Sequence, residues 1–541
     1  MGLKSYIRQK VIDAVKFAVR EELSATGKDC NEDGYRSLQQ TEEEIVQRLD
    51  KQIERWTWER FKRTDSLFDE MNYELQYNMT NGMDKIKKGV DVSTSRVVDE
   101  KVKYWTARRQ EQIIGDVNKQ IERWTWERYK RSEDKLLYVY KLQNQLAELL
   151  FEQKKVPYYK GDKIRMVFLF QVASFWPSWE SFYKSCVDDP RIEVKLLFLD
   201  ETVREAVQMQ SAKKFLEQEK LEYIDFCDFD IDEYKPHVVV IQTPYDAGHR
   251  IKAHWSSAWK AKGYRVVYIP YGIEISDTET SHSMHFEQHV VENAWRIYTF
   301  SEIMLKDYRK YCINAGAVRV LGLPKFDSLC NRGTFPLDSD LAERIAGRKV
   351  CLWKVHFPKI FEENGKDIFV TPDINEYIAF AEYAARHGNI FFIFMPHPRF
   401  KEPVKEKRLQ ELAEKLMGTL ENVENVYIDL KDDYRNSLTN ADFIIVDRSA
   451  VMVEAAAVGV PILYMVNSDF YEPVTKAIEP LINSYEKGST CADMIEFTEA
   501  CMRGEDRNRD IRNKSFRECI PFFDGHCGER IKEDIVQGIV K

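Results

Sequence analysis

Three polar segments of the chain each follow a short apolar run, and their side chains suit the binding of a diphosphate. The segments are KVH at 354–356, PHPR at 396–399 and DRS at 447–449. Arg binds a phosphate through two parallel hydrogen bonds, and His can donate a proton or a hydrogen bond to a leaving group. His397 lies between two prolines, which stiffen its turn. We therefore expect His356, His397 and Arg399 to bind the phosphates of a donor molecule.

The third segment stands where a strand should end and a helix should begin. The apolar run FIIV before it predicts a buried strand, and VMVEAAAV after it predicts a helix with one acid, Glu454. Ligands of open α/β sheets bind at the carboxyl ends of strands, against helix amino ends that carry free N–H groups and partial positive charge. We therefore predict a diphosphate-binding site at Asp447, Arg448 and Ser449. The alternative is an ordinary helix cap, since Ser and Asp cap many helices.

The composition limits the classes of protein to which this chain can belong. A chain of 541 residues is too long to fold around one hydrophobic core, so we expect several domains. The net charge of −9 gives no support for nucleic-acid binding over the whole surface. Ten scattered cysteines without a C-x-x-C pair, and no signal peptide, indicate the cytoplasm. No apolar run approaches the roughly 18 residues that span a bilayer, so we expect a cytoplasmic protein that can lie on the inner face of the cell membrane.

Residues 1–158 are predicted to form an all-α helical region. No proline precedes Pro157, and the segment KQIERWTWERFKR at 51–63 returns at 119–131 as KQIERWTWERYKR. We interpret this repeat as a duplicated helical unit. Its Trp and basic residues suit a membrane surface. The alternative is a helical bundle or coiled coil, through which the chain would form a homo-oligomer.

Beyond residue 158, apolar strands alternate with helical stretches, which predicts βαβ units and parallel sheets. We expect two Rossmann-like domains that face a cleft, one over 159–335 and one over 336–541, with a final helix that packs back across them. The predicted strands are 164–170, 192–199, 237–242, 265–269, 295–300 and 317–321 in the first domain, and 350–353, 390–395, 426–428, 443–446 and 461–464 in the second.

Longer motifs resemble a known family. The order of MPHPRF at 395–400 and VDRSAVMVEAAAVGVPILY at 446–464 resembles the CDP-glycerol glycerophosphotransferases of teichoic acid and capsule synthesis. The segment VRVLGLPKFDSL at 318–329 is similar to the G-x-P-x-x-D segment that this family carries between its domains, and SFWPSWESFY at 174–183 fits as well. The resemblance covers residues 163–525, the α/β part alone.

The resemblance implies a GT-B fold whose C-terminal domain holds the nucleotide. The implied reaction moves glycerol phosphate, or a related polyol phosphate, from CDP-glycerol to a hydroxyl of a cell-surface glycan or lipid-linked acceptor, with release of CMP. By motif match His397 would contact the donor phosphates, and Asp447, Ser449 and Glu454 would lie in the donor site. The matched segments hold no Asp-x-Asp pair. We therefore expect no metal and no cofactor.

The chain departs from this family at one position. The family has a His-Gly pair at the end of a first-domain strand, often assigned as the catalytic base, and this chain reads IPYG at 269–272. Tyr271 and Gly272 are therefore expected on the acceptor side. A Tyr, with an ordinary pKa of about 10, serves poorly as a base near pH 7. Nearby candidates for the base are Glu274, Asp277, His282 and His285. The choice among them stays open, and Glu274 is the working assignment.

Two other functions stay open at this point. The same fold serves glycosyltransferases that use a nucleotide sugar, and it would also serve as a catalytically inactive scaffold that oligomerises through its N-terminal helices. The expected partners are a nucleotide-activated donor and a glycan or lipid-linked acceptor, with no nucleic acid. The identity of the released nucleotide would separate these functions.

Overall fold

The computed structural model describes residues 147–541 apart from 201–205, 359, 364–365, 370, 402–406, 468 and 471, together with isolated helical positions between 130 and 145. The chain divides into two compact units, Met1–Ser132 and Glu133–Lys541. Every element below belongs to the second unit. Both copies of the repeated KQIERWTWER segment lie outside the described residues. Of the predicted helical region, the described part is residues 147–158, which are helical to residue 154, together with the isolated helical positions from 130 onward.

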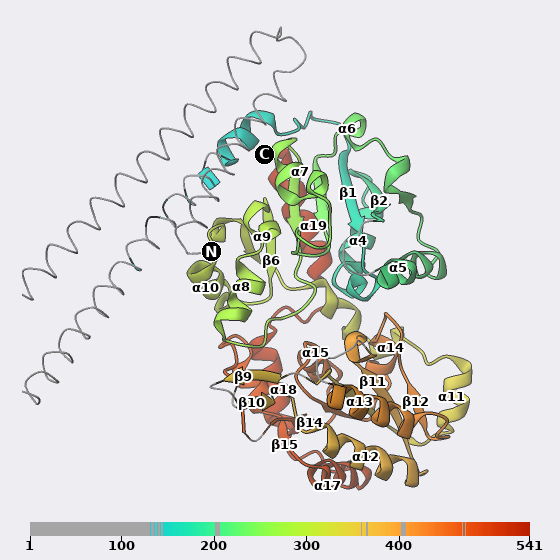
Figure 1. Cartoon of the computed structure of the whole chain (residues 1–541). Helices are drawn as coiled ribbons and strands as arrows, with labels where there is room; N and C mark the ends of the chain where they lie inside the picture. Colours follow the sequence, from blue (N-terminus) through green and yellow to red (C-terminus); the bar gives the residue numbers. More distant parts are fainter. Residues whose placement is uncertain are drawn as a thin grey trace, which may run out of the picture. The chain divides into compact units, whose positions relative to one another are not determined.

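The first domain is built on a parallel sheet of seven strands in the order β3-β2-β1-β4-β5-β6-β7 (Figure 1). The strands are β1 (Ile164–Phe170), β2 (Ile192–Phe198), β3 (Ile224–Asp225), β4 (Val238–Ile241), β5 (Arg265–Tyr268), β6 (Arg296–Thr299) and β7 (Val318–Val320). The central strands are continuous apolar runs because helices cover both faces of a parallel sheet. All four residues of β4, for example, are buried.

Helical segments connect these strands and follow the last of them. They are η1 (Ala173–Ser178), α4 (Glu180–Val187), α5 (Ala206–Gln218), η2 (Phe226–Asp228), α6 (Ile231–Tyr234), η3 (Lys252–His254), α7 (Ser256–Ala261), α8 (Glu279–Phe286), α9 (His289–Asn293), α10 (Glu302–Tyr311), η4 (Ala315–Ala317), η5 (Pro324–Cys330) and η6 (Arg332–Thr334). The segment η5 leads from the first domain to the second.

The second domain is built on a parallel sheet of six strands in the order β12-β11-β8-β13-β14-β15. Its strands are β8 (Lys349–Val355), β11 (Ile390–Pro396), β12 (Val426–Ile428), β13 (Phe443–Val446), β14 (Ile462–Met465) and β15 (Glu486–Gly488), and an antiparallel pair, β9 (Ile360–Glu363) and β10 (Lys366–Phe369), follows β8. Its helical segments are α11 (Ser339–Ile345), α12 (Ile374–Arg386), η7 (Pro398–Lys401), α13 (Lys407–Leu420), α14 (Arg435–Thr439), α15 (Val451–Val458), α16 (Glu479–Asn483), α17 (Cys491–Met502), α18 (Arg509–Cys519) and α19 (Cys527–Val540).

The predicted pair of parallel α/β domains is confirmed, and each predicted strand is present to within a few residues of its expected ends. The pattern missed β3, β9, β10 and β15. These strands have two to four residues each. Segments this short carry too little periodicity to be distinguished from loops, because a strand signal needs about four to eight residues.

In each sheet the strand order reverses beside the strand that comes first in that domain's sequence. Such a switch point favours ligand binding. In the first domain the reversal falls between β1 and β4, and in the second between β8 and β13. At the second switch point Val446 of β13 pairs with Lys354 of β8, and Val355 of β8 pairs with Pro396 of β11. The three polar segments of the sequence therefore leave three adjacent strands at one edge.

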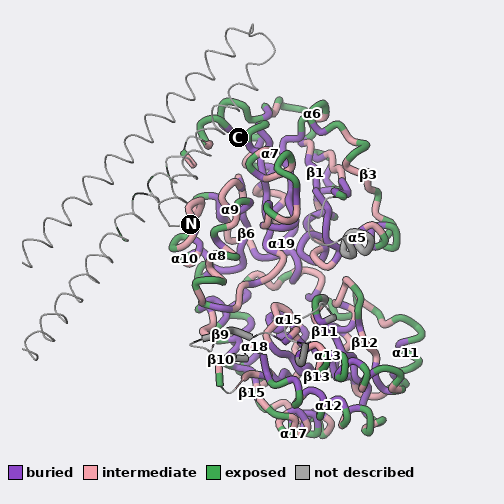
Figure 2. Tube along the Cα trace, viewed as in Figure 1, coloured by how far each residue is buried: buried purple, intermediate pink, exposed green. Residues whose placement is uncertain are grey.

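The hydrophobic core runs through both domains, and buried residues follow the strands in Figure 2. Alternate residues of β8 face opposite sides of the sheet, as the pleat requires. Val350 and Leu352 join the core that continues into the first domain, while Cys351 and Trp353 join a separate core under α12 and α17. Among the described residues no helix combines the length and the apolar character needed to cross a bilayer.

The last helix, α19, packs against α4 of the first domain (Figure 1). Gly528 permits this contact, since a Cβ built there would lie 2.4 Å from the backbone nitrogen of Phe182. A second glycine, Gly538, lies under the ring of Trp295, which a Cβ would approach to 2.8 Å. The chain therefore returns to its first domain after the second is complete.

The residues before β1 also pack on the first domain. Phe151 and Val156 are buried, and the backbone N–H of Val156 donates to the carbonyl of Gly263 at 3.0 Å. Glu148 forms an ion pair with the buried Lys260. Residues 148–156, which belong by sequence to the expected helical region, thus take part in the core of the α/β part.

We predict that Gly528→Ala destabilises the protein by about 1–3 kcal/mol, because the added methyl group collides with the backbone of α4. Gly418→Ala is the matched control. It places the same methyl group late in α13, where a Cβ meets nothing within 4 Å, and should be neutral or stabilising by up to about 1 kcal/mol. Denaturant unfolding of both variants measures the difference, and equal stabilities would contradict the close packing of α19.

Candidate functional site

Histidines and an aspartate meet at the carboxyl ends of β8, β11 and β13. The backbone N–H of His356 donates to both carboxylate oxygens of Asp447, at 2.8 and 3.0 Å. The ring of His356 lies 4.8 Å from the ring of His397 between centroids, and the ring of Phe357 lies 5.0 Å from that of His397. The structure thus brings together residues that are 91 positions apart in sequence.

Asp447 is buried beside a buried lysine. Its carboxylate also accepts a hydrogen bond from the hydroxyl of Tyr377 at 3.0 Å. Burial raises the pKa of Asp447, although the backbone N–H of His356 and the charge of Lys354 oppose the rise. Burial likewise lowers the pKa of Lys354, with Asp447 and Asp429 opposing. Both shifts favour the neutral forms, so burial narrows the pH range over which this aspartate and this lysine are both charged.

The orientation of His397 is fixed by the backbone around it. Its N–H donates to the carbonyl of Val355 at 2.8 Å, and its Nδ1 accepts from the backbone N–H of Arg399 at 3.1 Å. An accepting Nδ1 leaves the proton of a neutral imidazole on Nε2. Burial, then the charges of His356, Lys354 and Arg399, lower the pKa of His397 to about 2. His397 is thus a neutral ring that offers one N–H donor.

Ser449 precedes the amino end of α15. Its carbonyl accepts from the N–H of Met452 at 3.0 Å, while its hydroxyl lies 3.4 Å from the N–H of Val451, a long hydrogen bond. The helix VMVEAAAV is buried around most of its circumference, as expected for a helix packed on both sides. Gly459 ends it with a positive φ of 76°. The amino end of α15 lies at the edge that also carries Asp447, and the N–H groups of Val451, Met452 and Val453 are bonded within this turn.

Arg448 is engaged by a carboxylate of its own domain. Its Nε and Nη2 each lie 2.5 Å from an oxygen of Glu472, and Nη2 donates to the hydroxyl of Ser276 at 3.2 Å. Ser276 belongs to the first domain and pairs with Val474 in an isolated antiparallel bridge. Arg448 thus joins the DRS segment to the first domain.

The acceptor-side residues lie against the start of α15. A Cβ built on Gly272 would lie 3.7 Å from the Cβ of Ala450. The ring of Tyr271 stacks on Phe175 with centroids 3.8 Å apart, and its hydroxyl lies 3.3 Å from that of Tyr245. Burial raises the pKa of Tyr271 well above its ordinary value, and Tyr245 adds to the rise. Tyr271 is thus a neutral aromatic surface near pH 7.

The candidate bases lie in different surroundings. Glu274 is partly buried, and its Oε1 accepts from the N–H groups of Ile275 and Ser276 at 3.0 and 2.9 Å. Burial raises the pKa of Glu274, and the charge of Arg448 limits the rise. Among these residues a raised carboxyl pKa suits general-base chemistry best.

The other three candidates are occupied elsewhere. The pKa of the half-buried His285 is lowered to about 4 by loss of solvent, and its Nε2 lies 3.2 Å from the hydroxyl of Tyr308. His282 pairs with Asp277 at 2.6 Å and stacks on Tyr311. Glu274 is therefore the candidate whose charge interacts with both the DRS segment and the acceptor-side tyrosines.

Sequence reasoning missed several residues of this region: Ser276, Lys325, Tyr377 and Glu472. Lys325 lies in the recognised segment GLPKFD, so its motif was a usable signal. Its Nζ donates to the carbonyl of Tyr271 at 2.8 Å and pairs with Glu454. Tyr377 and Glu472 reach the site from α12 and from the loop after β14, and nothing in their local sequence indicates it.

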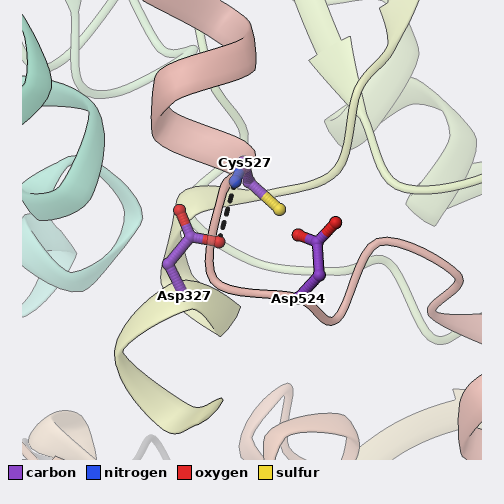
Figure 3. A group of neighbouring side chains, drawn as sticks. All are labelled: Asp327, Asp524 and Cys527. Atoms are coloured by element: carbon purple, nitrogen blue, oxygen red, sulfur yellow. Dashed lines mark hydrogen bonds between the residues drawn. The ribbon is translucent and has the colours of Figure 1, made fainter. Parts of the chain in front are cut away.

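Within the described residues one side-chain group could geometrically hold a metal ion, and it lies at the start of α19 (Figure 3). Its members are Asp327, Asp524 and Cys527. Asp327 already accepts from the N–H groups of Cys527 and Gly528 at 2.9 and 2.8 Å, and Arg530 donates twice to Asp524. Burial raises the pKa of the Cys527 thiol, which opposes a thiolate ligand. We interpret the group as a cap for α19.

No model of a known protein family matches this chain, and no curated protein matches it. Solved structures are similar in arrangement. S. aureus MnaA with UDP is 14% identical, over 69% of this chain and 97% of that one, with a TM-score of 0.49. UDP-GlcNAc 2-epimerase from Neisseria meningitidis, bound to UDP-GlcNAc, is 12% identical over 69% and 100%, with a TM-score of 0.46.

A variant of the wall teichoic acid polymerase TagF is 12% identical to this chain, over 74% of this chain and 93% of that one, with a TM-score of 0.46. Identities and scores at this level carry no conclusion about activity. The function proposed below therefore rests on the contacts within this chain.

We predict that His397 makes the protein less stable as the pH falls. Its pKa in the folded protein, about 2, lies below the ordinary value of about 6.5, so between these values the unfolded state binds the extra proton. From pH 6.5 to 5 this costs up to about 2 kcal/mol, since each pH unit corresponds to about 1.4 kcal/mol. His397→Gln should remove that part of the loss.

Denaturant unfolding at several pH values measures this effect. His237 and His285, whose pKa values are also lowered by burial, remain in both proteins, so the difference between wild type and variant isolates His397. The matched control is His526→Gln, at a side chain that is 65% exposed. Parallel stability curves for wild type and His397→Gln would show that the ring is not buried as described.

Proposed function

We propose that this protein is a GT-B transferase that moves a polyol phosphate, such as glycerol phosphate, from a CDP-activated donor to an acceptor hydroxyl. The observation that carries the proposal is the convergence of His356, His397 and Asp447 at one switch point beside the amino end of α15. This edge lies against Gly272 of the first domain. A donor bound there would present its diphosphate to the acceptor side.

In this proposal the second domain binds the donor. The Nε2–H of the neutral His397 donates a hydrogen bond to the leaving phosphate. The Ser449 hydroxyl and the partial positive charge at the amino end of α15 bind the diphosphate. Arg399, whose guanidinium lies 5.1 Å from the ring centre of Phe357, adds positive charge at the same strand end. The buried Asp447 accepts from the backbone N–H of His356, and the charge of Lys354 contributes to the lowered pKa of His397.

The first domain supplies the acceptor side and the base. The carboxylate of Glu274 takes the proton of the acceptor hydroxyl as its oxygen attacks the phosphorus that carries the polyol. A new P–O bond forms to the acceptor, the P–O bond to the nucleoside phosphate breaks, and CMP leaves with that electron pair. The carboxylate fits this role better than Tyr271, because burial keeps the phenol of Tyr271 protonated.

We expect the protein to bind CMP more tightly than UDP or GDP, and to release CMP from CDP-glycerol or CDP-ribitol. Calorimetric titration and nucleotide-release assays over a panel of CDP-polyols, UDP-sugars and GDP-sugars test this. His397→Gln should weaken CMP binding roughly tenfold through the lost hydrogen bond. Release of UDP or GDP would favour the nucleotide-sugar glycosyltransferase instead. Binding without any release would favour the inactive scaffold.

We predict that Glu274→Gln lowers kcat by roughly 10²-fold, as expected for loss of a general base, and leaves the Kd for CMP nearly unchanged. Because burial raises the pKa of Glu274, the wild-type rate should fall as the pH drops below a value above the ordinary 4.3 of Glu, and the variant should lose that fall. The control is Glu279→Gln, an exposed acid in α8. A variant with wild-type kcat would exclude Glu274 as the base.

A further inference from the structure

Lys325 is a buried cation between the two domains. It lies in η5 and is 3% exposed. Its ammonium group has two partners in different parts of the fold, the carboxylate of Glu454 in α15 and the carbonyl oxygen of Tyr271, which accepts at 2.8 Å. One side chain therefore connects the helix that starts at the DRS segment with the acceptor-side loop.

The partner carboxylate is equally enclosed. Glu454 is 1% exposed, and its Oε1 is the oxygen that meets Lys325. Its Oε2 is buried as well. The hydroxyl of Tyr434 lies beside this carboxylate, because after burial the charge of Glu454 and a side-chain hydrogen bond to it raise the pKa of Tyr434. A donor nucleotide cannot reach this carboxylate in the described conformation, because both of its oxygens face protein.

The loop that Lys325 holds is the one that carries the acceptor-side residues. Tyr271 stacks on Phe175, and Gly272 lies against Ala450 at the start of α15. The carbonyl of Tyr271 is a backbone group, so its bond to Lys325 constrains the path of the chain rather than one rotamer. Glu274 follows three residues later and is carried by the same loop.

We propose that Lys325 is a positioning residue for the transfer reaction, with Glu454 as its counter-ion. The pair sets the distance between the acceptor-side loop and the amino end of α15. The inference rests on the function proposed above. In this inference Glu454 pairs with Lys325 and does not contact the donor, in contrast to its expected place in the donor site. Misplacement of reacting groups by about 1 Å can cost 10²-fold in rate, so a tether of this kind affects turnover without touching substrate.

The test separates positioning from mere stability. Lys325→Met alone leaves the Glu454 charge buried without a cation, so it should lower the Tm strongly. The double variant Lys325→Met with Glu454→Gln removes both charges at nearly constant volume and should recover most of that Tm. Because the double variant still lacks the bond to Tyr271, its kcat should stay roughly 10- to 100-fold below wild type, with the Kd for CMP within about twofold.

The matched control is Lys260→Met with Glu148→Gln. It removes another pair of a buried lysine and a glutamate, in the first domain. This control should change the Tm and leave kcat unchanged. Lys325→Arg is a second comparison, since it keeps the charge and a donor but changes their geometry. A partial rescue of kcat by Arg, greater than by Met, is expected.

Amide hydrogen exchange supplies a readout that does not depend on activity. In the double variant, peptides that contain residues 269–277 should exchange faster than in wild type, while peptides from β8 and β13 should not. If wild type releases no nucleotide from any donor, the proposed function fails. The exchange result alone then tests whether Lys325 holds the loop at residues 269–277.

Three results would overturn the inference. Wild-type kcat in the double variant would make the ion pair purely structural. A loss of CMP affinity in step with kcat would make Glu454 a donor contact. Unchanged exchange over residues 269–277 would show that Lys325 does not hold the loop.

Discussion

The two α/β domains meet over buried positive charges, and each of these charges must have a carboxylate partner because burial of an unpaired ion is costly. Lys325 pairs with Glu454 across the junction. Arg435, which is 3% exposed by its side chain, pairs with Glu180 of the first domain as well as with its neighbour in sequence. These pairs specify which surfaces of the domains can meet, since any other register would leave the cations buried without partners.

The chemistry of the candidate site follows from the direction of the strands. Parallel strands deliver all of their carboxyl ends to one edge, and the reversal of strand order between β8 and β13 opens a place for a ligand there. The low dielectric around these strand ends keeps His397 neutral and raises the pKa of Glu274. The same burial that stabilises the sheets therefore tunes the groups that the proposed reaction needs.

The segment GLPKFD between the domains illustrates how a short motif can serve structure and function together. Gly322 has a positive φ of 89°, and a Cβ there would lie 2.4 Å from the sulfur of Cys527, so only glycine fits. Asp327 caps α19 through the N–H groups of Cys527 and Gly528. Lys325, between them, reaches toward α15. The motif anchors the last helix on one side and the acceptor-side loop on the other.

The sequence by itself determined the two parallel sheets, nearly all of their strands and the end of α15, because apolar periodicity and the glycine at 459 are local signals. It also indicated that polar strand ends would share one edge. The partners of those side chains were decided by the tertiary structure alone. Arg448 meets Glu472, and Lys325 meets Glu454, through contacts between distant segments, and local pattern carries no information on such pairs.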